Sequence, residues 1–201
     1  MKHALTIVLF YLCALAYARS GPAGHCWRVI PSESRISFAV DQAGAPLQGT
    51  FASADGTVCL GTDAYRGRAR VTVQTSSVRT ALPQLDDALR GADFFNVSRW
   101  PRAVFESDDI ERFVEDGYEA KGQLRVRDVR HDLTVGFALK SEANGRRAVL
   151  HAEFTIKRLN YGIGQDQWSD TQWVSAGVHV VISATLDPSA TDLDGQAAGG
   201  D

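Results

Sequence analysis

The chain has 201 residues and a formal net charge of -3, with 21 Lys and Arg against 24 Asp and Glu. A mildly acidic protein is poorly suited to bind a phosphate backbone or adhere to anionic lipid, so we expect no nucleic-acid partner. This length fits one domain with a single sizeable core.

The first 18 residues have the pattern of a secretory signal peptide. Met1-Lys2-His3 is a short basic start, residues 4–15 are almost wholly apolar, and Ala16-Tyr17-Ala18 is a small-x-small cleavage site. Cleavage after Ala18 would remove Lys2 and no acid, which changes the net charge from -3 to -4. We expect export to the periplasm; retention of the segment as an N-terminal anchor is the alternative.

Apolar and polar residues alternate along most of the remaining chain. The pattern is clearest in residues 36–40, 71–73, 124–126, 133–139 and 150–156. Such alternation predicts antiparallel strands with one solvated face. Turn signals at residues 41–44, 116–117 and 144–145 separate these runs. About eight hairpin-linked strands favour an all-β sandwich or barrel.

One segment departs from this period. In residues 83–90 the apolar side chains fall at i, i+3 and i+4, with Pro83 at the start and Gly91 after the end, which predicts a short amphipathic helix. Phe94 and Phe95 follow it. The helix either covers one end of a barrel as a lid or simply caps the core.

Two cysteines remain after cleavage, Cys26 and Cys59. If the first hairpin turns near Gly44, residues whose numbers sum to about 87 face each other, and Cys26 falls within two residues of Cys59. In an exported protein such a pair favours a disulfide over two free thiols. His25 lies beside Cys26, but a set of metal ligands is lacking, so we expect no metal. Residues 189–201 are small and acidic and predict a disordered tail.

Several short motifs, taken in order, resemble the YceI-like family of exported lipocalin-like proteins. They are Trp27-x-Val29-x-Pro31-x-x-Ser34-x-Ile36-x-Phe38, Gly49-x-Phe51, Ser77-Val78-x-Thr80, residues 89–97, Pro101-x-Ala103-x-Phe105-x-Ser107, Gly122-x-Leu124-x-Val126-Arg127 and residues 158–164. The resemblance covers residues 26–188. Asp128 and Asp132 depart from the family pattern, where glycine and proline are usual.

The resemblance implies an eight-stranded antiparallel barrel whose lumen holds a long isoprenoid tail. The continuation Gly164-Gln165-x-x-Trp168 is similar to a branch associated with cytochrome b561-type membrane proteins. The expected ligand is therefore an isoprenoid lipid of quinone or polyprenyl type, and no other cofactor is expected. This branch favours a quinone and makes such a membrane protein a candidate partner; a homodimer is a further candidate assembly. An eight-stranded barrel can be filled by side chains or can hold one slender ligand if enough of them are small. A packed barrel without a guest is the alternative.

The candidate ligand-binding residues are apolar and lie on inward faces or in the loops expected at the mouth. They are Phe38, Phe51, Phe94, Phe95, Ala103, Phe105, Leu124, Val126, Val135, Phe137, Ala152, Phe154, Ile156, Tyr161 and Trp168. The small residues Gly49, Ala103, Gly122 and Ala152 are expected to leave room for the tail. Arg158 is expected to pair with an acid such as Asp170 and pin the mouth loop, or to face a polar head group.

A catalytic constellation cannot be assembled from the remaining residues. His151 and Glu153 share a strand face that should be the outer one, and neither Ser77 nor Ser107 has a nucleophile context. We therefore expect a binding protein and not an enzyme. The alternative function is an exported β-domain without a lumenal ligand that acts in stress response or electron transfer through a membrane partner.

Overall fold

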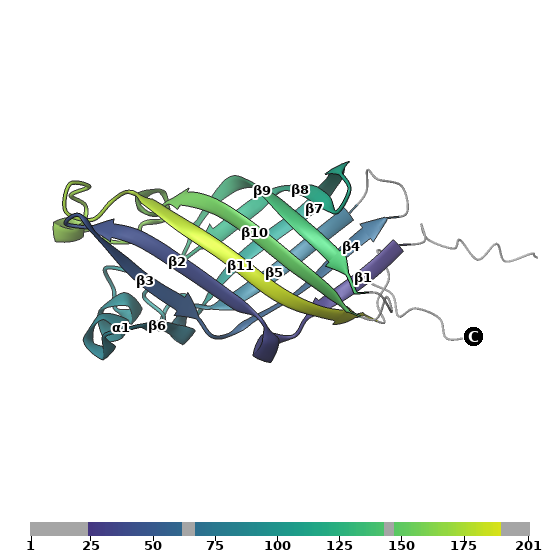
Figure 1. Cartoon of the computed structure of the whole chain (residues 1–201). Helices are drawn as coiled ribbons and strands as arrows, with labels where there is room; N and C mark the ends of the chain where they lie inside the picture. The colour runs from purple at the N-terminus through teal and green to yellow at the C-terminus, as the bar shows by residue number, and fades with distance from the viewer. Residues whose placement is uncertain (1–23, 62–66, 143–146, 190–201) are drawn as a thin grey trace, which may run out of the picture.

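A computed structural model describes residues 24–61, 67–142 and 147–189 (Figure 1). The strands are β1 (Gly24–Val29), β2 (Arg35–Gln42), β3 (Ala45–Phe51), β4 (Ala54–Gly61), β5 (Gly67–Gln74), β6 (Val78–Thr80), β7 (Arg102–Val114), β8 (Gly117–Val126), β9 (Val129–Ser141), β10 (Ala148–Lys157) and β11 (Gly177–Pro188). The helix α1 is Pro83–Arg90, and short 3-10 turns are η1 (Pro31–Glu33), η2 (Thr75–Ser77), η3 (Arg158–Tyr161) and η4 (Asp166–Trp168).

These strands form the closed, eight-stranded antiparallel barrel that the sequence predicts. Three of the eight long strands are interrupted, so that β1 continues into β2, β3 into β4, and β5 into β6. The order around the barrel is β1-β4-β5-β7-β8-β9-β10-β11, and pairing of β11 with β1 closes it. The remaining parts of the three interrupted strands also pair: β11 with β2, β2 with β3, and β3 with β6.

The first hairpin has the predicted turn, and its register shifts at the interruption. Ala43 and Gly44 take positive φ angles of 52° and 81°, as a two-residue hairpin turn requires. In β2 and β3, Ile36 lies opposite Phe51, which gives the expected sum of 87. The segment between β1 and β2 is longer than the segment between β3 and β4, so the register beyond it shifts by two. Cys26 therefore lies directly opposite Cys59.

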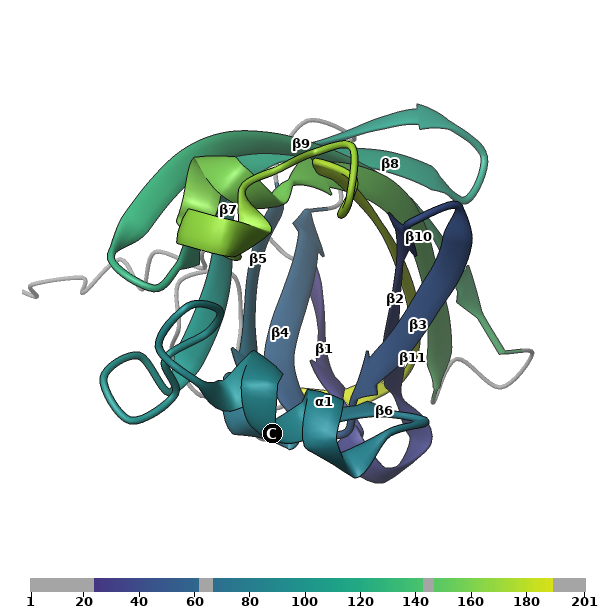
Figure 2. The ribbon, with the colours of Figure 1, turned by 90° about the vertical axis from the view of Figure 1, so that its left-hand side faces the viewer.

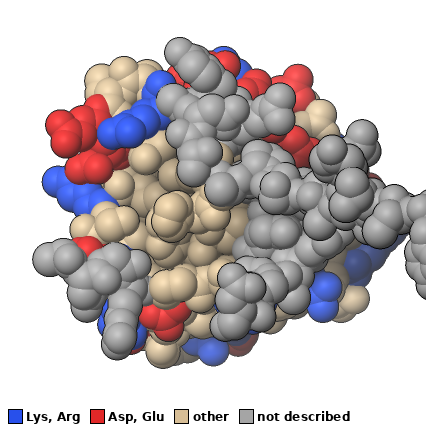
Figure 3. Space-filling model, turned by 90° about the vertical axis from the view of Figure 1, so that its right-hand side faces the viewer, with Lys and Arg blue, Asp and Glu red and all other residues tan. Residues whose placement is uncertain are grey.

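The two ends of the barrel differ. We call the end with the β2–β3 turn, α1 and residues 158–176 the mouth, and Figure 2 shows these segments arranged around it. At the opposite end, the far end, a cluster that includes Ile110, Ala148 and Leu186 fills the interior, and these three side chains are 1% exposed or less. Among the described residues visible on this face, those near the centre are mostly residues other than Asp, Glu, Lys and Arg (Figure 3).

Helix α1 covers the same bounds as the predicted helix, residues 83–90. Its Leu89 joins a second buried cluster at the mouth with Val78, Phe94 and Ile163. In the described residues, no helix is long and apolar enough to cross a membrane. The predicted signal peptide, residues 1–18, and all but the first residue of the predicted tail lie outside the described residues, as does the turn signal at 144–145.

Candidate ligand-binding cavity

A cavity of about 230 Å³ lies inside the barrel and reaches the mouth. Its lining is apolar except for Gln42, Thr75 and Arg158. The other lining residues are Ile36, Phe38, Val40, Leu47, Phe51, Val58, Ala69, Val71, Val73, Leu85, Leu89, Phe94, Phe95, Ala103, Phe105, Ala120, Leu124, Val126, Leu133, Val135, Phe137, Leu150, Ala152, Phe154, Ile156, Ile163, Trp168, Val174, Val178, Val180 and Ile182.

The alternation of apolar and polar residues along the strands produces this lining. Along β10, His151 and Glu153 point outward and are exposed, whereas Ala152, Phe154 and Ile156 line the cavity. Phe154 and Ile156 keep intermediate exposure although they point inward. A filled core would bury such side chains. The lumen is therefore a hollow and not a continuous packed core.

Fourteen of the fifteen predicted site residues line the cavity; Tyr161 does not. Tyr161 is buried in the cluster at the mouth, and its ring meets that of His131 edge-on at 5.2 Å between centroids. Burial raises the pKa of its phenol. The sequence showed an aromatic in a mouth loop, but the 3-10 turn η3 directs this one away from the lumen.

The interpretation of two small residues as lumen space is wrong. A Cβ atom built on Gly49 would overlap the ring of Phe38, and one built on Gly122 would overlap the backbone carbonyl oxygen of Glu106 on the neighbouring strand β7. Neither glycine lines the cavity: Gly49 gives space to an aromatic ring, and Gly122 allows close approach of the β7 backbone. Ala103 and Ala152 do line it, and Ala69 and Ala120 are further small lining residues.

Arg158 holds the mouth loop together through backbone carbonyls. Its Nε donates to the oxygen of Ser175 at 2.9 Å. One Nη donates to Ile163 and Gly164 at 3.0 and 2.9 Å, and the other to Trp168 and Val174, both at 2.7 Å. All five N–H groups of the guanidinium are thus used.

No described acid forms a salt bridge with Arg158, so the expected pairing with Asp170 is wrong. Asp170 instead accepts a hydrogen bond from the backbone N–H of Gln172 at 2.8 Å. Burial lowers the pKa of Arg158, whose side chain is 3% exposed. Carbonyl dipoles stabilise the buried charge here, and sequence spacing could not reveal partners of this kind.

Position 164 in this loop requires a glycine. It adopts a positive φ of 70°, and a Cβ atom there would overlap the guanidinium of Arg158. Its N–H donates to the carbonyl of Asp93 at 2.7 Å, which ties the loop to the segment after α1. The glycine in this aromatic loop therefore gives the arginine space and connects two sides of the mouth.

Aromatic side chains from the segment after α1, from β3 and from the mouth loop cover the cavity. Phe94 contacts Trp168 and Phe95 contacts Phe51, each with ring centroids 5.5 Å apart. Leu85 and Leu89 of α1 also line the cavity. The helix with its following segment is thus part of the cavity wall at the mouth.

Other polar groups have structural partners. Ser107 donates to the carbonyl of Lys121 at 2.8 Å, and Ser77 donates to that of Gln74 at 2.6 Å. His151 lies 3.1 Å from Glu153 on the outer face of β10, as expected. Within the described residues, no group of three or more His, Cys, Asp or Glu side chains is placed to hold a metal ion.

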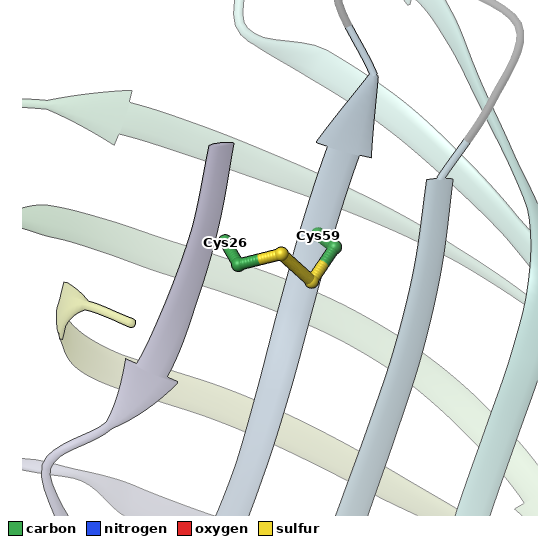
Figure 4. The surroundings of a disulfide bond; sticks show 2 residues. All are labelled: Cys26 and Cys59. Atoms are coloured by element: carbon green, nitrogen blue, oxygen red, sulfur yellow. A yellow bond between two sulfur atoms is a disulfide. The ribbon is translucent and has the colours of Figure 1, made fainter. Parts of the chain in front are cut away.

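A disulfide joins Cys26 of β1 to Cys59 of β4, which confirms the predicted pairing (Figure 4). The two cysteines are buried and lie on neighbouring strands towards the far end. The bridge therefore stabilises the half of the barrel that is remote from the mouth.

Fold and cavity together define a small antiparallel β-barrel with an apolar lumen, an architecture shared with lipocalins. The YceI-like domain profile matches residues 27–186, and the chain belongs to this family. The chain is 33% identical over 137 residues to the UPF0312 protein of Serratia proteamaculans, an alignment that covers 65% of this chain and 71% of that protein. It is 29% identical over 151 residues to Protein YceI of Escherichia coli, with coverage of 72% and 78%.

Two solved structures show the same fold. Burkholderia cenocepacia BcnA superposes with a TM-score of 0.74 at 23% identity and covers 78% of this chain and 98% of its own. A polyisoprenoid binding domain from Saccharophagus degradans gives 0.65 at 12% identity, with coverage of 81% and 98%.

Proposed function

We propose that this protein is an exported carrier of a long-chain isoprenoid lipid, which it binds without chemical conversion. The tail lies in the barrel cavity and the head group lies at the mouth. The family, the apolar lumen and the relation in fold to a polyisoprenoid binding domain support the lipid class. The disulfide and the predicted signal peptide support export to the periplasm.

The shape of the cavity is the observation that best supports the proposal. Its lining on β10 extends from Leu150 to Ile156, which is about 20 Å of strand at about 3.3 Å per residue. Apolar cavities of about 150 Å³ already bind benzene, whereas drug-sized ligands occupy pockets of about 300–1,000 Å³. A cavity of about 230 Å³ with this length suits a slender chain better than a bulky ring system.

Burial of the tail could supply the binding free energy. At about 0.8 kcal/mol per buried carbon, one five-carbon isoprene unit contributes about 4 kcal/mol. Association costs about 4–15 kcal/mol in lost freedom of motion. A few buried units therefore offset this cost without a polar anchor.

The polar groups at the cavity favour a neutral head that accepts hydrogen bonds. The five N–H groups of Arg158 are already used, and the hydroxyl of Thr75 donates to the carbonyl of Trp100. Among the described residues that line the cavity, Gln42 has a side-chain amide without a hydrogen-bond partner, which is available to a ligand. A quinone carbonyl matches such a donor, whereas a phosphate would require a cationic donor that is not already engaged.

The test is extraction of protein purified under native conditions from an exporting host. Mass spectrometry should find an isoprenoid lipid in near-stoichiometric amount. An added long-chain isoprenoid quinone should quench the fluorescence of Trp168, which lines the cavity. The matched variants are Trp168→Phe, which should lose most of the quenching, and Trp173→Phe at an exposed position, which should retain it. The absence of both lipid and quenching would contradict the proposal. A cytochrome b561-type partner and a homodimer stay predictions.

A further inference from the structure

Three uncharged segments meet at the mouth: residues 42–48, 81–85 and 171–175, which we call the mouth rim. The backbone N–H of Ala43 donates to the carbonyl of Trp173 at 2.8 Å, and Gln42 forms a β-bridge with Val174. On the other side, β3 pairs with β6, whose Thr80 directly precedes residues 81–85. The rim is therefore continuous along one side of the opening (Figure 2).

The rim contains no charged residue. It holds 17 residues, and in this chain 22% of residues are charged, so an average stretch of that size would hold about four charges. Its members include the exposed Ala43, Pro46 and Ala81. Leu47, Leu85 and Val174 of the rim line the cavity, so its surface is continuous with the lumen.

Two large apolar side chains project from the rim into solvent. Leu82 is 58% exposed and Trp173 is 53% exposed. Their backbones are fixed: the N–H and carbonyl of Leu82 both bond the hydroxyl of Thr80, and the N–H of Trp173 donates to Asp170. Local hydrogen bonds thus fix the backbone of both residues at the edge of the opening.

The charges beside the rim are mainly acidic. Asp41, Asp87 and Asp170 lie within two residues of the rim segments in sequence and are exposed, and Arg79 is the exposed basic residue within the same distance. This arrangement would repel an anionic surface and leaves a neutral apolar one as the better match. Tryptophan is also favoured where a bilayer meets water, because its ring is apolar and its N–H is polar.

We propose that the mouth rim docks on a lipid bilayer of neutral net charge, with Leu82 and Trp173 inserted at its surface, so that the tail passes directly between bilayer and cavity. This inference rests on the proposed function, since it concerns how the same cavity is loaded. It also predicts that docking does not depend on attraction to anionic lipid.

The test compares two double variants. Leu82→Ser with Trp173→Ser removes the projecting side chains of the rim. Phe113→Ser with Val114→Ser is the matched control, because these residues are 65% and 55% exposed at the tip of the β7–β8 hairpin, at the far end. For each protein, equilibrium binding of a long-chain isoprenoid quinone is measured in detergent. The rate of quinone transfer from phosphatidylcholine vesicles is then measured separately.

The rim variant should bind the quinone in detergent as the wild type does, but its transfer rate and its flotation with vesicles should fall by at least about tenfold. The control variant should keep both the transfer rate and the flotation of the wild type. Trp173→Phe with Leu82→Ile should restore transfer. Replacing about a third of the vesicle lipid by phosphatidylglycerol should not accelerate transfer.

Equal transfer by rim variant and wild type would overturn the docking proposal. So would an equal loss in the far-end control, or self-association of the wild type through the rim, seen as a dimer that the rim variant lacks. A wild type that binds no quinone in detergent would instead refute the proposed function, so the two failures are distinguishable.

Discussion

Replacing Arg158 by lysine tests whether one guanidinium organises the mouth. Arginine here donates five hydrogen bonds to five backbone carbonyls, and lysine has only three N–H donors. At least two buried carbonyls would lose their donor, at about 1–3 kcal/mol each, so Arg158→Lys should lower the free energy of unfolding by about 2–6 kcal/mol.

The assay is urea denaturation followed by tryptophan fluorescence, combined with hydrogen exchange of residues 162–176. Two controls should stay within about 0.5 kcal/mol of the wild type: Arg125→Lys on the exposed face of β8, and Asp170→Asn, which tests the ion pair that the structure lacks. An Arg158→Lys protein as stable as the wild type, with an equally protected loop, would show that the carbonyl contacts contribute nothing.

Three further outcomes are expected. Denatured, unreduced protein should contain no free thiol from Cys26 or Cys59. Replacing both cysteines by serine should lower the free energy of unfolding by about 4 kcal/mol, because the bridge spans 33 residues. Two titratable thiols per chain would refute the bridge. The Ala152→Trp variant should have a melting temperature at or above that of the ligand-free wild type, but it should lose isoprenoid binding. A much lower melting temperature, as overpacking by about 1–3 kcal/mol would cause, would mean that the cavity has no room beside Ala152. Burial alone would raise the pKa of Asp86. Hydrogen bonds from Thr80 and the positive charge of Arg90 have the larger combined effect, so the pKa is lowered. The stability it confers is therefore full above the ordinary Asp pKa of about 3.9 and is lost as pH falls through the lowered value. Asp86→Asn should be less stable than the wild type at neutral pH, with a gap that closes in acid; a gap independent of pH would exclude the carboxylate as its cause.

The sequence predicted those features that depend on local periodicity. Alternation identified the inward residues of β9 and β10, and the i, i+3, i+4 spacing gave the bounds of α1. Counting from the turn at Gly44 brought Cys26 close to Cys59, because antiparallel pairing keeps the sum of facing residue numbers constant between irregularities.

Features that depend on three-dimensional partners could not be predicted. The five acceptors of Arg158 are backbone carbonyls, which every residue has, so no side-chain pattern marks them. The sequence does not show that Gly49 faces the ring of Phe38 or that Gly122 faces the backbone of Glu106, so both resemble lumen-forming residues in the sequence. Pro31 signals the interruption between β1 and β2, whereas Asp55-Gly56, which also suggests an interruption, lies inside β4. The observed interruptions at residues 52–53 and Thr75–Ser77 contain neither glycine nor proline.

The three interruptions lie on adjacent strands and so form a transverse seam across one part of the barrel. On the far side of the seam, β1, β4 and β5 are paired within the closed barrel, and the disulfide ties two of them together. On the mouth side, β6 pairs with β3 alone. Segments with fewer shared hydrogen bonds open at lower free energy. Backbone amides of β6 should therefore exchange faster than those of β5, which pairs with a strand on each side, so the wall of the barrel opens most readily at β6.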